Sequence, residues 1–176
     1  MARRGVFRSN AVSVIDYRCE AERHDPPFVE LHNSFSLSYV RRGAFGCRAR
    51  GRSFELVAGS ILVGHPSDEY TCTHEHLGGD ECLSFHLAPA LVDAIGYRPD
   101  IWRTVCVPPL PQLVVLGELA QAAAEGSGEI GLDEIGAARR PLCRAFLAAV
   151  AKTGGNPTMR PPPRCPGGAV DRCERA

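Results

Sequence analysis

The segment LSYVRRGAFGCRARGRSFELVAGSILV, residues 37–63, contains three glycine dipeptides that separate short apolar runs. Arg42-Gly43, Arg50-Gly51 and Ala58-Gly59 lie about 8 residues apart, which is the turn spacing of short antiparallel strands. Apolar and polar residues also alternate over residues 12–17 and 35–40. We therefore predict an antiparallel β-sandwich or β-barrel for this part of the chain.

The pattern changes after Leu87, where helical features replace alternation. Pro89 and Gly96 bracket a short predicted helix, and leucines and alanines from residue 113 to residue 123 recur at helical spacing. Residues 133–152 are a third predicted helix, although Pro141 must kink or break it. Strands followed by two or three C-terminal helices indicate an α+β fold that is mainly β.

These features divide the chain into four predicted segments. We expect an N-terminal arm (1–9), a β-barrel (10–87), a helical dimerisation segment (88–152) and a disordered tail rich in proline and arginine (153–176).

Composition excludes several classes of protein. The 176 residues are 44% hydrophobic, and 20 basic residues balance 20 acidic ones, so no net field attracts nucleic acid or an anionic membrane. No apolar run approaches the roughly 20 residues that span a bilayer. Eight cysteines without an export signal indicate reduced thiols and a cytoplasmic location.

Residues 65–86, HPSDEYTCTHEHLGGDECLSFH, hold four of the six histidines and two of the eight cysteines. We expect a β-hairpin region here, with a turn at Gly78-Gly79 and side chains that converge on one site. Cys72, His74, His76 and Cys82 could hold zinc, because thiolate and imidazole are its preferred ligands. In the alternative reading the cysteines are small buried residues and the two histidines lie in a solvated turn. We expect His65 and His86 to be structural and His24 to lie in a loop.

The runs LSYVRRG (37–43) and FELVAGSILV (54–63) resemble the N-terminal cupin domain of AraC-type transcription regulators. The likeness covers about residues 10–135. It implies a cupin-type β-barrel that binds a small-molecule effector, followed by helices that form a homodimer. The family joins this domain to a C-terminal helix-turn-helix domain, whose pattern does not follow here. We therefore expect a truncated or frame-altered regulator, which reaches DNA only through a missing or partner domain.

Cupin enzymes bind a metal through a motif of the form H-x-H-x3-E-x6-G and a later histidine. With the glycine set on Gly43, the resemblance places Glu30, His32 and Ser36 at the first three ligand positions and Tyr70 at the fourth. The usual metal set is therefore largely absent, and we expect no cofactor there.

Period-2 alternation still puts Glu30, His32, Ser34, Ser36 and Ser38 on one face, where they and Tyr70 could bind a polar ligand. In the alternative reading this strand has one solvated face. We expect a non-enzymatic effector-sensing domain. The competing hypothesis is a metal-dependent cupin enzyme that uses His32 with Glu30, or the Cys72/His74/His76/Cys82 set.

Overall fold

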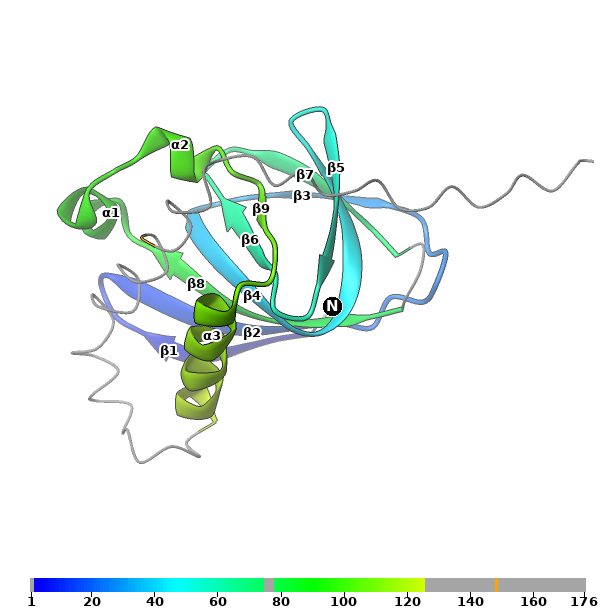
Figure 1. Cartoon of the computed structure of the whole chain (residues 1–176), viewed down its shortest axis with the longest axis horizontal. Helices are drawn as coiled ribbons and strands as arrows, with labels where there is room; N and C mark the ends of the chain where they lie inside the picture. Colours follow the sequence, from blue (N-terminus) through cyan, green and yellow to red (C-terminus); the bar gives the residue numbers. More distant parts are fainter. Residues whose placement is uncertain (1, 75–77, 126–147, 149–176) are drawn as a thin grey trace, which may run out of the picture.

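The computed structural model describes residues 2–74, 78–125 and 148. Its strands form one antiparallel network that folds into two facing layers (Figure 1). The strands are β1 (Ala2–Arg8), β2 (Val12–Cys19), β3 (Phe28–Leu31), β4 (Phe35–Ala49), β5 (Arg52–Val57), β6 (Ile61–Gly64), β7 (Glu69–Thr73), β8 (Asp80–Leu87) and β9 (Cys106–Val107). This arrangement confirms the predicted antiparallel barrel or sandwich.

The 15-residue strand β4 joins the two layers. Its first half pairs with β6 and β8 in the layer ordered β1-β2-β8-β4-β6-β9. Its second half pairs with β5 and β7 in the other layer, where β3 pairs with β7. The register shifts between Val40 and Arg42, and Gly43 follows with φ +73°. A Cβ at Gly43 would lie 2.3 Å from the carbonyl oxygen of Gly79, so this crossing requires glycine.

Alternation along the strands builds two separate cores. One face of β2, β4 and β8 presents apolar residues such as Val14, Tyr39 and Leu83 to the helices. The opposite face points into the barrel, where Val40, Phe45 and other apolar side chains form the second core. Polar residues such as Ser38 and Ser84 lie on the face of β4 and β8 that points into the barrel.

In the part of the chain that the structure describes, three helices pack on the apolar face of the first layer (Figure 1): α1 (Pro89–Ile95), α2 (Pro99–Trp102) and α3 (Pro111–Ala124). Helix α1 begins with Pro89 and ends at Gly96, as predicted. Trp102 and Leu113 are fully buried between the helices and the sheet. Helix α3 lies so close to β4 that a Cβ at Gly117 would lie 2.5 Å from the ring of Tyr39. None of the described helices is long and apolar enough to cross a bilayer.

The structure differs from the sequence expectations in three places. Residues 2–8, expected as an arm, form strand β1 and pair with β2. Residues 65–86 do not form a hairpin, because β7 and β8 lie in different layers and both pair with β4. The short elements α2 and β9 were not predicted. The helix predicted over 133–152 and the tail over 153–176 fall outside the described residues, apart from position 148.

Candidate functional site

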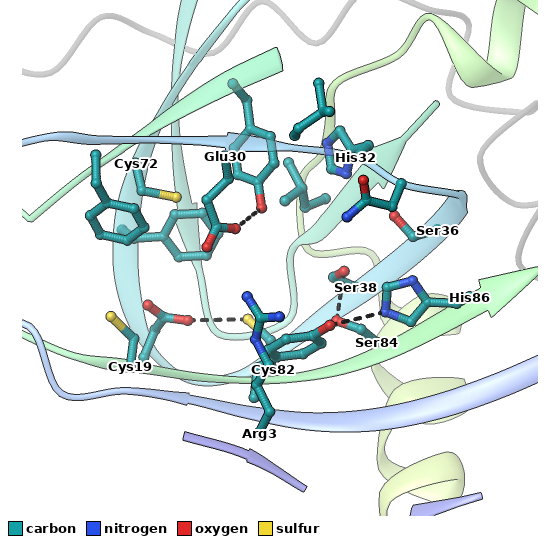
Figure 2. A pocket seen from close by; sticks show the side chains of 18 of the residues that line it. Arg3, Cys19, Glu30, His32, Ser36, Ser38, Cys72, Cys82, Ser84 and His86 are labelled. Carbon is teal, nitrogen blue, oxygen red and sulfur yellow. Dashed lines mark hydrogen bonds between the residues drawn. The ribbon is translucent and has the colours of Figure 1, made fainter. Parts of the chain in front are cut away.

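A cavity of about 370 Å³ lies inside the barrel between the two layers (Figure 2). Its lining combines hydroxyl, imidazole, carboxyl and thiol groups, the guanidinium of Arg3 and the amide of Asn33 with a few apolar side chains. The lining includes the hydrogen-bonding residues Tyr17, Glu30, His32, Ser36, Ser38, Tyr70, Ser84 and His86. A cavity of this size with convergent polar groups is typical of small-molecule binding sites.

One wall is formed by β3, the segment that follows it, and β7. Glu30 and Tyr70 are direct cross-strand partners, and the Tyr70 hydroxyl donates a hydrogen bond to Glu30 Oε2. The ring of His32 stacks on the ring of Tyr70 with 4.4 Å between centroids. Burial, and then the Glu30 carboxylate, raise the pKa of Tyr70. Burial also lowers the pKa of His32 to about 4, against the opposing pull of nearby carboxylates. At neutral pH the imidazole of His32 on this wall is therefore neutral, and one oxygen of Glu30 is already bonded to Tyr70.

Gly64 keeps space open beside this wall. A Cβ at this position would lie 2.3 Å from both His32 Nδ1 and Ser36 Oγ, so any side chain here would displace two lining residues.

The facing wall is formed by β4 and β8. Ser38 and Ser84 pair across the two strands, and the Ser84 hydroxyl donates to Ser38 Oγ at 2.7 Å. His86 is held at both ring nitrogens, since Ser34 Oγ lies 2.9 Å from Nδ1 and the Tyr17 hydroxyl lies 3.3 Å from Nε2. Burial and the neighbouring Arg3 lower the pKa of His86. The side chains that β4 and β8 contribute to this wall are therefore uncharged and rich in hydroxyls, and the guanidinium of Arg3 lines the cavity beside them.

The structure brings together five of the six residues predicted to bind a ligand. Glu30, His32, Ser36, Ser38 and Tyr70 line the cavity. The sixth residue, Ser34, instead holds the imidazole of His86.

Sequence reasoning missed His86, Ser84 and Tyr17 as lining residues. Period-2 alternation along residues 82–87 carried the signal, because it places Ser84 and His86 on the face of Cys82 and opposite Phe85.

Among the described residues of the predicted metal set, only His74 belongs to a cluster of ligand atoms. Cys72 pairs across from Cys47 and packs in the barrel core, while His76 lies outside the described residues. His74 does lie in a ligand cluster, but its partners are Cys19 and Asp80. Cys82 takes part indirectly, since its thiol lies 3.2 Å from Asp80 Oδ2. Cys19 was not predicted, because it lies more than fifty residues before His74 in the sequence.

The arrangement around Glu30 and His32 is suited to binding. A catalytic metal usually needs about three protein ligands. At this position Tyr70 occupies one Glu30 oxygen and stacks on His32, and Ser36 stands where the resemblance expects a carboxylate. These groups can donate and accept hydrogen bonds to a polar molecule.

Comparison with protein-family models and with curated proteins found no match. Among solved structures, the chain is similar to ToxT from Vibrio cholerae O395 bound to (E)-4-(8-methylnaphthalen-1-yl)but-3-enoic acid. The TM-score is 0.56 at 12% identity, and the match covers 82% of this chain and 58% of that one. This likeness shows a shared fold.

Two smaller structures match about half of the chain. A cupin superfamily protein from Desulfitobacterium hafniense has a TM-score of 0.40 at 14% identity, covering 49% of this chain and 75% of that one. A cupin-2 domain protein from Shewanella frigidimarina has a TM-score of 0.39 at 16% identity, covering 49% and 80%. The fold itself is the cupin-type antiparallel barrel with C-terminal helices that the sequence predicted.

Proposed function

We propose that this protein is the effector-sensing and dimerisation domain of an AraC-type transcription regulator and is not an enzyme. The observation that carries the proposal is the cavity, whose two walls offer Ser36, Ser38 and Ser84 on one side and His32 with Glu30 on the other. ToxT, an AraC-family regulator that shares the fold, has been captured with a small molecule bound. That finding supports a small-molecule effector for this chain as well.

The chemistry of the walls favours a polar effector with several hydroxyl or amide groups. Neutral imidazoles and hydroxyls both donate and accept hydrogen bonds, whereas Glu30 only accepts. A polar molecule can use the hydrogen-bonding capacity that these groups have left after bonding to one another, whereas an apolar molecule of the same size cannot. The site should therefore discriminate by hydrogen bonding more than by shape.

A direct path connects the cavity to the helices. Ser38 points into the cavity, while the next residue, Tyr39, points out of the other face of β4. The Tyr39 hydroxyl donates to Glu118 of α3 at 2.8 Å, and its ring packs against Gly117. A shift of β4 on effector binding would therefore move α3. Exposed Val115 and Leu119 on that helix could in turn form a dimer contact.

A thermal-shift screen of the purified chain tests the proposal. We expect sugars, polyols and small hydroxy acids to include compounds that raise the melting temperature in proportion to the logarithm of concentration. Apolar molecules of similar volume should have no effect. A screen in which no polar compound stabilises the protein, or in which only apolar compounds do, would contradict the assignment.

A further inference from the structure

Three side chains with metal-binding atoms meet at the end of the barrel where β2 ends and β8 begins. Cys19 is the last residue of β2, and its cross-strand partner is Asp80, the first residue of β8. His74 follows β7 directly and is 2% exposed. The ligand atoms of these three residues all lie within 4.8 Å of one another.

Local backbone geometry holds the three residues in place. Gly79 adopts φ +70°, and a Cβ there would lie 2.8 Å from the carbonyl oxygen of Cys19, so the turn into β8 packs tightly on the end of β2. The backbone of His74 accepts a hydrogen bond from the amide of His24 at 2.8 Å. The ring of His74 stacks on Phe28, with an interplanar angle of 18°. These three side chains therefore need little rearrangement to bind an ion.

Two of the three distances between the ligand atoms fit a tetrahedral ion. His74 Nε2 lies 3.6 Å from Cys19 Sγ and 3.5 Å from Asp80 Oδ1. With ordinary zinc bond lengths, a tetrahedral site needs about 3.6 Å between sulfur and nitrogen and about 3.4 Å between nitrogen and oxygen. Both observed separations are therefore within 0.2 Å of a zinc geometry.

A fourth residue orients the carboxylate of Asp80. The Cys82 thiol lies 3.2 Å from Oδ2 and donates to it, so Oδ1 is the oxygen left facing His74. Partners of this kind fix the orientation of a metal ligand without touching the ion. Figure 2 shows the thiols of Cys19 and Cys82 at the same end of the cavity, away from His32 and Ser36.

We propose that Cys19, His74 and Asp80 form a binding site for a zinc-class divalent cation, with Cys82 as a positioning residue. Thiolate, imidazole and carboxylate are all zinc ligands, and the set is too soft for Mg²⁺ or Ca²⁺. The site is separate from the Glu30/His32/Ser36/Tyr70 position where the cupin resemblance places a metal. It also goes beyond the proposed function and does not depend on it.

The proposed metal site opens onto the cavity. Three protein ligands leave a fourth position on a tetrahedral ion. Cys19 and Asp80 both line the cavity, so water or a donor atom of a bound molecule can take that position. The ion would in addition tie the end of β7, in one layer of the barrel, to the ends of β2 and β8 in the other layer.

Cobalt titration of the full chain, purified without an affinity tag and stripped with a chelator, tests the site. We expect one equivalent of Co²⁺ to produce a thiolate charge-transfer band in the near ultraviolet and visible bands of tetrahedral intensity. One equivalent of Zn²⁺ should then abolish these bands and raise the melting temperature of the wild type.

Matched variants assign the ligands. Cys19→Ser and Asp80→Asn should each weaken Co²⁺ binding at least 100-fold, because each removes one of three ligands. Cys72→Ser is the control, since this cysteine lines the same cavity but lies outside the cluster, and it should retain the wild-type spectrum. Circular dichroism of the metal-free variants verifies that they fold. If Cys19→Ser does not fold, the isosteric Asp80→Asn variant alone tests the ligand assignment. Wild type without a cobalt–thiolate band, an unchanged band in Asp80→Asn, or equal loss in Cys72→Ser would overturn the site.

Discussion

At the scale of single residues, Tyr70 makes the contacts on which one wall of the cavity depends. Its hydroxyl donates to Glu30, and its ring supports His32. Removal of the hydroxyl would leave a partly buried carboxylate oxygen without its donor, while the ring stacking would remain. A substitution at Tyr70 that removes only the hydroxyl thus separates the contribution of this hydrogen bond to stability from that of the ring packing.

Tyr70→Phe should lower the free energy of unfolding by about 1–2 kcal/mol, because a partly buried acceptor oxygen of Glu30 loses its donor. Urea denaturation followed by tryptophan fluorescence measures this, since Trp102 is buried in the folded protein. Tyr97→Phe is the control, because Tyr97 is 43% exposed. Equal stability of the two variants would show that the bond to Glu30 contributes nothing.

His32 makes stability depend on pH. Its pKa falls from 6.5 to about 4 in the folded protein, mainly through burial, with Asp68, Glu30, His65 and His86 as the neighbouring titratable groups. Between pH 6.5 and about 4 the unfolded chain binds a proton at His32 that the folded chain does not, so the free energy of unfolding falls as the pH is lowered. The expected loss across this window is about 2 kcal/mol after allowance for solvent screening.

Stability curves of His32→Gln between pH 4 and 7 test this interpretation. The variant should show a shallower dependence than the wild type over the window, whereas His24→Gln, in an exposed loop, should match the wild type. A slope unchanged in His32→Gln would mean that other groups cause the acid destabilisation.

At the scale of elements, helix α3 packs directly against β4. Gly117 faces the ring of Tyr39, which is 2% exposed and therefore has nowhere to move. Arg41, on the same strand, reaches Asp16 at 3.0 Å and Glu125 at 3.4 Å. Packing and charge thus both fix this helix on the sheet.

Gly117→Ala should destabilise the protein, although alanine favours a helix by about 1 kcal/mol. The added methyl group would lie 2.5 Å from the Tyr39 ring, and overpacking of this kind costs about 1–3 kcal/mol. We expect a lower melting temperature by differential scanning calorimetry. Gly5→Ala, where nothing lies within 4 Å of the new Cβ, should not lower it. A more stable Gly117→Ala protein would show that α3 is not held against Tyr39.

The proposed dimer contact belongs to the same helix. Val115 and Leu119 are 58% and 52% exposed and lie one turn apart. In sedimentation velocity we expect a wild-type dimer and a monomer after the double change Val115→Glu and Leu119→Glu. Val29→Glu with Leu31→Glu, on exposed positions of β3, should leave the dimer intact. Dissociation by the β3 pair, or a dimer that survives the α3 pair, would place the interface elsewhere.

At the scale of the whole molecule, periodicity predicted the fold well and the site in part. Glycine turns and alternation identified the strands from β4 to β6, and Pro89 and Gly96 marked α1, because these signals are local. The pairing of β7 and β8 could not be read in this way. Both strands flank β4, so their partners depend on contacts between distant segments.

The same reasoning explains the site residues. Alternation was expected to place Glu30, His32, Ser34, Ser36 and Ser38 on one face. All of these except Ser34 line the cavity, but they do so from two walls, because β3 ends at Leu31 and β4 begins at Phe35. The Cys19/His74/Asp80 cluster was missed in part, because it requires the ends of β2 and β8 to meet. Effector binding inside the barrel would also involve the facing wall, where the Ser84 hydroxyl donates to Ser38.

Binding of a polar small molecule inside the barrel is tested most directly by isothermal titration calorimetry with the best polar compound from the thermal-shift screen. Ser84→Ala removes a buried hydroxyl from the cavity, while Ser53→Ala removes an exposed one from β5. We expect one binding site per chain and a dissociation constant at least about 10-fold weaker in Ser84→Ala, equivalent to about 1.4 kcal/mol, with Ser53→Ala unchanged. Equal affinities in the wild type and both variants would show that the compound does not bind inside the barrel.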